Sequence, residues 1–305
     1  MMKRYAVVDI GTNSARLMVA HIENDCVVAD YKTLRLIRVG EGMVGKRVIV
    51  PAAMARTKQA LLEYLQISKE FGVNKEAFFA FATSAVRDAE NKEAFWEFIR
   101  SECGVDIDII SGDREALLGF AGCIDGEGAM FDIGGGSTEV MQGSLNDVRF
   151  AHSFRIGTVR MLQMFPSGDD ADPQAFEQAH ALAAKTFSQV PKSGSLGYTG
   201  IGGTATALAA LDIGLTEYIS EKIQGHIITL QRAQELCSML KSKTKEQRKA
   251  INGLPENKAD VIVYGAIIFL EFMKAVGVKF VIISDSDNQE GYLKFKLGLI
   301  EVYCR

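Results

Sequence analysis

Two short segments of the sequence place an aspartate beside a glycine turn, and both are suited to hold phosphate. They read DIGTNS over residues 9–14 and DIGGGS over residues 132–137, lie 123 positions apart, and each follows an apolar run. Glycine lets the main chain approach a ligand closely, and successive backbone amides can surround phosphate oxygens. One such turn is usually a hairpin, but two copies predict a phosphate-binding cleft between two related halves. Its predicted phosphate-binding residues are Gly11, Thr12, Asn13, Ser14, Gly134, Gly135, Gly136 and Ser137.

A third glycine-rich turn consists of Gly202, Gly203 and Thr204, and it follows an apolar run over residues 196–201. An alanine-rich segment comes after it, and the free amides at the N-terminus of a helix bind anions. Taken alone, this pattern is also typical of simple packing between a strand and a helix. Beside the other two turns, it predicts a further wall of the same cleft.

Strands alternate with helices along the chain, which predicts an α/β fold. Ser111 is a suitable N-cap for a helix that ends near residue 124, and glycines at 119 and 122 let another segment approach that helix. Strands are expected at residues 5–10, 15–22, 26–39 (two pieces), 77–82, 105–110, 129–133, 139–141, 148–154, 196–201 and 279–283. Helices are expected at residues 52–71, 91–102, 112–124, 157–165 and 173–189, in a run over 204–276, and at the end of the chain.

The 305 residues are enough for about two domains, and 48% hydrophobic with 24% charged residues is typical of a globular protein. We expect one domain over residues 1–120 and a second over 121–291. A final helix at about 292–305 is expected to pack back on the first domain. The net charge of −4 excludes a polybasic surface for a nucleic acid duplex or an anionic membrane. A polyanionic ligand must therefore be held locally.

The longest uncharged apolar stretch covers residues 261–270, which is too short to span a bilayer as a helix. The N-terminal apolar run is also too short for a signal peptide. These features predict a cytoplasmic protein that does not bind membranes. The five cysteines are scattered without a CxxC pair, so neither disulfides nor a cysteine-based zinc site is expected. A homodimer is one assembly that the sequence leaves open.

Five segments in this order and spacing resemble the exopolyphosphatase and guanosine pentaphosphate phosphatase (Ppx/GppA) family, part of the actin-like ATPase superfamily. The resemblance extends from about residue 5 to residue 295. It implies two duplicated actin-like (ribonuclease H-like) domains with a cleft between them. It also implies hydrolysis of the terminal phosphate of inorganic polyphosphate or guanosine pentaphosphate with Mg²⁺ or Mn²⁺. The segments are residues 9–17, 82–89, 110–117, 132–139 and 202–209.

Within this resemblance, Glu115 is the residue expected to orient and deprotonate the attacking water, because burial would raise its pKa toward a useful range. The alternative is an exposed glutamate that complements the helix dipole. Arg87 follows an apolar strand and a Thr-Ser turn, so it is expected at the carboxyl end of the sheet, where its guanidinium can hold phosphate. The alternative for Arg87 is a structural ion pair with Asp88 or Glu90.

Asp132, Glu139 and Asp9 are the expected magnesium ligands, directly or through water, because Mg²⁺ typically takes one or two carboxylates besides phosphate oxygens. The alternative for each aspartate is a carboxylate that caps its own turn. Arg16 either binds the substrate or faces the solvent.

The sequence departs from the family pattern at three places. Arg114 replaces the first acidic residue of a Ser-Gly-x-Glu-Glu-Ala motif, Asp287 stands where the family has glycine, and Gln289 stands where it has arginine. Longer members of the family continue into additional helical domains, which this chain is expected to lack. We therefore expect short polyphosphate chains to be favoured. Two other functions remain open: a nucleotide-dependent kinase or ATPase of the superfamily, and a non-enzymatic sensor of a phosphorylated alarmone.

Overall fold

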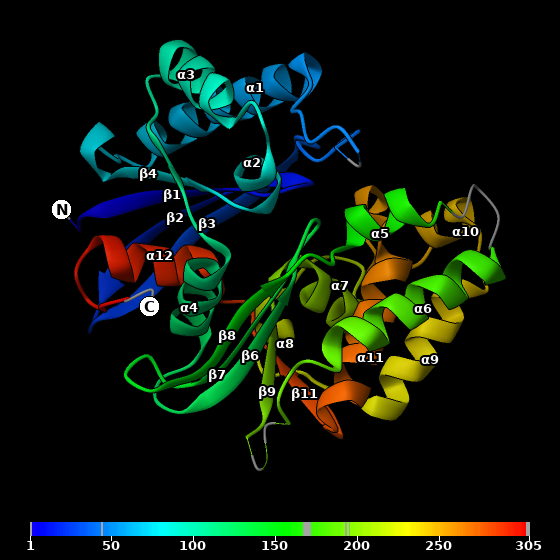
Figure 1. Ribbon diagram of the computed structural model, residues 1–305. Helices are drawn as coiled ribbons and strands as arrows, with labels where there is room; N and C mark the ends of the chain where they lie inside the picture. Colours follow the sequence, from blue (N-terminus) through cyan, green and yellow to red (C-terminus); the bar gives the residue numbers. More distant parts are fainter. Residues whose placement is uncertain (1, 44, 167–171, 193, 195, 303–305) are drawn as a thin grey trace.

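Two mixed β-sheets organise the chain, one at the upper left and one below the centre of the view in Figure 1. The computed structural model describes residues 2–43, 45–166, 172–192, 194 and 196–302. The first sheet has the order β3-β2-β1-β4-β5, and the second has the order β10-β11-β9-β6-β7-β8. The strands of the first sheet are β1 (Arg4–Ile10), β2 (Ser14–Glu23), β3 (Cys26–Leu36), β4 (Phe78–Ala82) and β5 (Ile107–Ile109). Those of the second are β6 (Gly128–Ile133), β7 (Thr138–Gly143), β8 (Val148–Phe154), β9 (Tyr198–Ile201), β10 (Ile227–Thr229) and β11 (Phe280–Ile283).

The central strand β1 is apolar along most of its length because both of its faces are covered. Ala6 and Val8 belong to the core beneath α1 (Pro51–Glu70) and α3 (Lys92–Cys103). Val7, on the opposite face, packs in a second cluster with Leu118 of α4 (Gly112–Cys123) and Tyr292 of α12 (Asn288–Lys296). The first sheet is thus a layer between two helix pairs, as Figure 1 shows.

The second sheet is covered on one face by a large helical layer. Its centre is α11 (Ile262–Val276), which is buried nearly all round and packs on Phe131 of β6 through Phe269 and Phe272.

Within the described residues, no helix is both long enough and apolar enough to span a membrane. The remaining helices are α2 (Ser84–Asp88), α5 (Thr158–Met164), α6 (Pro173–Phe187), α7 (Gly202–Ile213), α8 (Ser220–Ile223), α9 (Leu230–Lys241), α10 (Lys245–Lys249) and the 3₁₀ turns Lys75–Ala77 and Glu256–Lys258.

The duplication predicted from the sequence is confirmed in the pairing of the strands. In each sheet a three-stranded antiparallel meander is followed by parallel strands: β1 pairs with β2 and β4, and β6 pairs with β7 and β9. The two glycine turns also have the same geometry. The amide of Gly11 donates to Ser14 O at 3.0 Å, and that of Gly134 donates to Ser137 O at 2.9 Å.

Helix α4 joins the two halves of the molecule. Leu118 packs toward the first sheet, whereas Leu117 and Phe120 pack on Met130 and Ile201 of the second. The division expected after residue 120 falls inside this helix and stays a prediction. Ser111 caps α4 as expected, with its hydroxyl accepting from the Arg114 amide.

Two expected elements differ from the structure. Residues 26–39 were expected as two strands, but β3 is a single strand. It lies at the sheet edge and pairs with β2 along its length, so its polar residues face the solvent without interrupting it. The last helix was expected at 292–305, but α12 begins at Asn288, where the side chain of Asp287 caps it, and ends at Lys296. Helix α12 packs on α4 and β1, and residues 303–305 lie outside the described part of the chain.

Two glycines allow α4 and α12 to pack with their backbones in contact. A Cβ atom added at Gly122 would lie 1.9 Å from the carbonyl oxygen of Asp287, and one added at Gly291 would lie 1.8 Å from that of Leu118. Both neighbours are main-chain atoms, so neither can rotate away. The sequence-based expectation that glycines on this helix admit another segment is confirmed at Gly122.

We predict that Gly122→Ala and Gly291→Ala each lower the free energy of unfolding by at least about 2 kcal/mol, because the two helices must separate. The gain in helix propensity, about 1 kcal/mol, opposes this but is smaller. Gly197→Ala is the control, since a Cβ there meets nothing within 4 Å. Urea denaturation measures all three variants. Equal midpoints for the three would contradict the prediction.

Candidate functional site

The glycine turns of both sheets meet at a cleft between the two halves. A cavity of about 110 Å³ lies there, at the carboxyl ends of β1 and β6. The structure brings nearly all sequence-predicted site residues to this cavity, whereas Arg87 and Glu139 lie just behind its wall. Its lining includes Asp9, Gly11, Thr12, Asn13, Ser14, Arg16, Glu115, Asp132, Gly134, Gly135, Gly136, Ser137, Gly202, Gly203 and Thr204.

The two duplicated turns approach each other so closely that side chains are excluded from the second one. A Cβ at Gly135 would lie 3.0 Å from Cβ of Thr12, and a Cβ at Gly136 would lie 2.3 Å from Oγ of Ser84. The run of three glycines therefore serves contact across the cleft as well as access of the main chain to a ligand.

Glu115 lies in the first turn of α4, is 5% exposed, and accepts a hydrogen bond from Nη1 of Arg87 at 2.7 Å. Burial raises the pKa of the Glu115 carboxyl well above its ordinary value, the charge of Glu139 raises it further, and Arg87 opposes both. The alternative of an exposed, dipole-complementing glutamate is wrong. Arg87 forms its ion pair with Glu115, so neither Asp88 nor Glu90 is its partner.

Glu139 is the cross-strand neighbour of Asp132 in the second hairpin. Its carboxylate accepts from Oγ of Ser153 at 2.5 Å and is also hydrogen-bonded by Ser137. Burial and the nearby charge of Asp132 raise the pKa of Glu139 to about 7, against the lowering effect of the two serines. Glu139 is therefore a weaker acid than an ordinary glutamate.

Arg16 occupies in the first hairpin the position that Glu139 occupies in the second. Its guanidinium donates to Oδ2 of Asp9, its cross-strand neighbour, at 2.5 Å, and it also forms an ion pair with Asp287. Its side chain is 20% exposed, so the alternative in which Arg16 faces the solvent is wrong. Burial raises the pKa of Asp9 despite this pairing, whereas Arg16 and Lys32 hold the pKa of Asp287 below its ordinary value.

Gln289, one of the departures from the family pattern, does not point into the cleft. Its side-chain amide donates to Val7 O at 2.8 Å and to Arg16 O at 3.2 Å. These two hydrogen bonds therefore connect α12 to the first hairpin.

Asp132 faces the third glycine turn. Its Oδ2 accepts from the side-chain amide of Asn288 at 3.0 Å, and a Cβ at Gly202 would lie 2.1 Å from its Oδ1. Gly202 also has φ = +76°, so the position requires glycine for two reasons. Burial raises the pKa of Asp132 well above its ordinary value, and Arg16 opposes this.

Two residues of the cleft carried no recognisable signal in the sequence. Lys258 is the last residue of the 3₁₀ turn at 256–258 and donates to the carbonyl of Gly203. Burial and the charge of Arg16 lower its pKa to about 8. Asn288 comes from α12, more than 150 positions from its partner Asp132. Neither a lone lysine nor a lone asparagine can be assigned to a site without the tertiary contacts.

Three buried polar atoms of the cleft lack a hydrogen-bond partner: Oδ1 of Asp9, Oγ of Ser84 and Oδ1 of Asn288. Buried polar groups are normally hydrogen-bonded, so these atoms indicate a place for a polar ligand. Among the described residues, no three acidic, histidine or cysteine side chains converge as a metal site of their own. The assignment of Asp132, Glu139 and Asp9 to a metal ion therefore stays a prediction.

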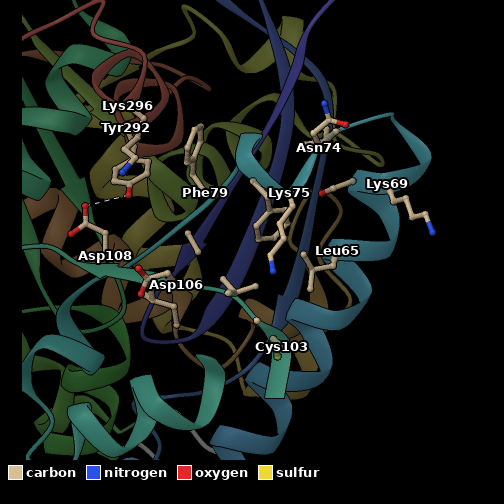
Figure 2. Close-up of a pocket in the computed structure, with 17 residues that line it drawn as sticks. Leu65, Lys69, Asn74, Lys75, Phe79, Cys103, Asp106, Asp108, Tyr292 and Lys296 are labelled. Atoms are coloured by element: carbon tan, nitrogen blue, oxygen red, sulfur yellow. Dashed lines mark hydrogen bonds between the residues drawn. The ribbon is translucent and has the colours of Figure 1, made fainter. Parts of the chain in front are cut away.

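A larger cavity, of about 810 Å³, lies elsewhere, at the amino ends of β4 and β5. Figure 2 shows Lys75, Tyr292 and Lys296 around it, with Tyr292 hydrogen-bonded to Asp108. None of the sequence-predicted site residues lines it. Size alone therefore does not identify the functional site of this molecule.

The chain is similar to known proteins over nearly its whole length. A model of the Ppx/GppA phosphatase family matches residues 18–298. Exopolyphosphatase 2 of Mycobacterium tuberculosis is 30% identical, over 94% of this chain and 97% of that protein. The bifunctional 3-dehydroquinate synthase/phosphatase of Fusobacterium nucleatum is also 30% identical over 94% of this chain. This chain spans only 45% of the Fusobacterium protein.

A solved structure supports the same assignment. The crystal structure described as an exopolyphosphatase from Cytophaga hutchinsonii matches with a TM-score of 0.87 and 27% identity, over 99% of this chain and 100% of that one. The predicted α/β class and duplicated actin-like architecture are confirmed. With a family model that covers most of its length, the chain belongs to the Ppx/GppA phosphatase family.

Proposed function

We propose that this chain is a phosphohydrolase that releases the terminal phosphate of short inorganic polyphosphate or of guanosine pentaphosphate. The observation that carries the proposal is the Glu115–Arg87 pair, buried beside two phosphate-binding turns at the cleft. A carboxylate held in this way can orient water and accept its proton. The expected cytoplasmic location and the option of a homodimer remain part of this proposal.

In the proposed reaction, the amides of the turns at Gly11, Gly134 and Gly202 bind the phosphate oxygens. Water adds to the terminal phosphorus atom, the bridging oxygen leaves with the rest of the substrate, and Glu115 takes the proton of the water. The raised pKa of Glu115 makes it a stronger base than an ordinary glutamate. Arg87 holds the carboxylate in place and supplies positive charge next to the reacting group.

The residues present fit a magnesium ion that is bound partly by the substrate. Mg²⁺ usually keeps several waters and takes one or two carboxylates besides phosphate oxygens. Asp132 and the unpartnered Oδ1 of Asp9 would hold it. Glu139 lies beside Asp132 on the neighbouring strand and would affect it through its charge. The ion would supply neutralisation of phosphate charge. Lys258 would contribute a further cation beside the third turn.

Beyond the reacting phosphate, the protein offers little unpaired positive charge to bind the rest of the substrate. A chamber of about 420 Å³ continues from the cleft past Arg16 and Lys258, and Lys32, Asp285 and Asp287 also line it. Lys32 is paired with Asp285 and Glu290. Arg16 is already paired with two aspartates, and Gln289 brings no charge. These contacts support a preference for short substrates.

Glu115→Gln is expected to reduce phosphate release by about 100- to 10,000-fold, because it preserves the shape but removes the base. Substrate binding should be largely kept. Single-turnover rates and equilibrium binding separate the two effects. Glu127→Gln, which changes an exposed acid paired with Arg149, is the control. Turnover of the Glu115 variant at the wild-type rate would eliminate Glu115 as the base.

Phosphate release is expected to require Mg²⁺ or Mn²⁺ and to stop in excess chelator. Asp132→Ala should lower the activity and raise the metal concentration needed for half of it, because one carboxylate is lost. Asp125→Ala, at a fully exposed side chain, should leave both unchanged. Metal titrations of phosphate release measure these values. Full activity in excess chelator is incompatible with the metal-assisted reaction.

Digestion of long polyphosphate is expected to be distributive, with shortened chains accumulating as a ladder on a gel. The reason is the lack of a continuous cationic track beyond the cleft, so the shortened chain dissociates after each cleavage. Triphosphate and guanosine pentaphosphate should be hydrolysed more efficiently than long chains. If long chains vanish while only free phosphate and full-length substrate are visible, the enzyme is processive and the prediction is wrong.

A further inference from the structure

Four arginines surround a second opening of the cleft, on the side of Glu115. Two cavities, of about 30 and 200 Å³, lie there between α2, the start of α4, the end of β8 and α5. They share Ser84 with the catalytic cleft, and each also shares a residue of the second glycine turn with it. The arginines are Arg47, Arg87, Arg155 and Arg160, and the acidic residues that line the same cavities are Asp88 and Asp113.

Arg155 and Arg160 share a single carboxylate, whereas Arg87 is paired with Glu115. Asp88 is shared, since Arg155 donates to its Oδ2 at 2.9 Å and Arg160 donates to the same atom at 3.2 Å. Arg47 has Glu90 as a partner at 3.3 Å. Burial lowers the pKa of Arg160, and the charge of Arg155 lowers it further, although Asp88 opposes this. The crowded guanidinium groups would therefore gain from an added anion.

Two contacts connect these arginines to the reaction centre. Nε of Arg160 donates to the carbonyl of Gly136 in the second glycine turn at 2.8 Å, and Arg87 donates to Glu115. Ser84 lines the cleft and both cavities, is 3% exposed, and has a hydroxyl oxygen without a hydrogen-bond partner. An unpartnered buried hydroxyl among guanidinium groups is suited to phosphate, which accepts from both.

We infer that Arg87, Arg155 and Arg160, with Ser84, form a second phosphate subsite that receives the orthophosphate released at Glu115. The inference rests on the proposed function. The terminal phosphate reacts beside Glu115 and Arg87, so the product is formed next to this opening. The remaining substrate lies over the glycine turns toward Lys258 and the larger chamber. The product can therefore leave by an opening that the remaining substrate does not fill.

Arg155→Ala is the informative variant, because Arg155 is 61% exposed, lies outside the catalytic cleft, and can be removed without leaving a buried cavity. Arg149→Ala is the matched control. Arg149 lies on β8, six positions earlier, is 46% exposed, and pairs with Glu127 away from the opening. Phosphate inhibition of the hydrolysis of triphosphate is measured for both variants, together with direct binding of inorganic phosphate by titration calorimetry.

We expect Arg155→Ala to weaken inhibition by phosphate about 10-fold, the effect of losing one charge-assisted contact, while KM for triphosphate stays unchanged. Calorimetry should show the same loss of phosphate affinity, and Arg149→Ala should match the wild type in both assays. A rise in KM without weaker phosphate inhibition would assign these arginines to the substrate chain and overturn the inference. Equal phosphate binding by both variants would also overturn it.

The binding measurement separates this inference from the proposed function. If the wild-type protein releases no phosphate from any of the substrates, the proposed function fails, while calorimetry still tests whether the arginines bind phosphate. If phosphate release is normal and Arg155→Ala binds phosphate as the wild type does, only the second subsite is wrong.

Discussion

The arrangement of the cleft depends on the direct backbone contact between α4 and α12. Gly122 and Gly291 bring the two helices so close that a single added methyl group would meet a carbonyl oxygen. Helix α4 carries Glu115 in its first turn, and the N-terminal residues of α12 include Asn288, which binds Asp132. Any separation of the helices would therefore move Glu115 and a partner of Asp132 at the same time. Interiors packed at this density transmit such shifts with little relaxation.

Several carboxylates are buried around one small cavity. Asp9, Glu115, Asp132 and Glu139 all have raised pKa values, chiefly because they are removed from water. Repulsion among them is limited by Arg16 on one side and Arg87 on the other. Such strongly perturbed groups are typical of functional sites. A bound cation or a set of hydrogen-bond donors would relieve this repulsion, whereas a phosphate without a cation would increase it.

The duplication explains why the two sides of the cleft have different chemistry. Both hairpins have the same turn and the same aspartate, but the residue paired across the strand from it is Arg16 in the first and Glu139 in the second. In the first hairpin, an arginine thus balances the charge of the aspartate. In the second hairpin, two carboxyl groups lie side by side. The carboxyl groups of the cleft therefore gather near Asp132, whereas arginines gather near Arg155.

Local chemistry in the sequence was enough to predict the glycine turns, the duplicated hairpins, the Ser111 cap and the position of Glu115 at the cleft, because each depends on neighbouring residues or on a known motif. Only the tertiary structure decided the partners of Arg16, the direction of Gln289 and the places of Lys258 and Asn288. The contacts of these residues join positions up to 282 residues apart. Which of them become neighbours depends on how the two sheets pack through α4 and α12, and no local pattern of residue types carries that information.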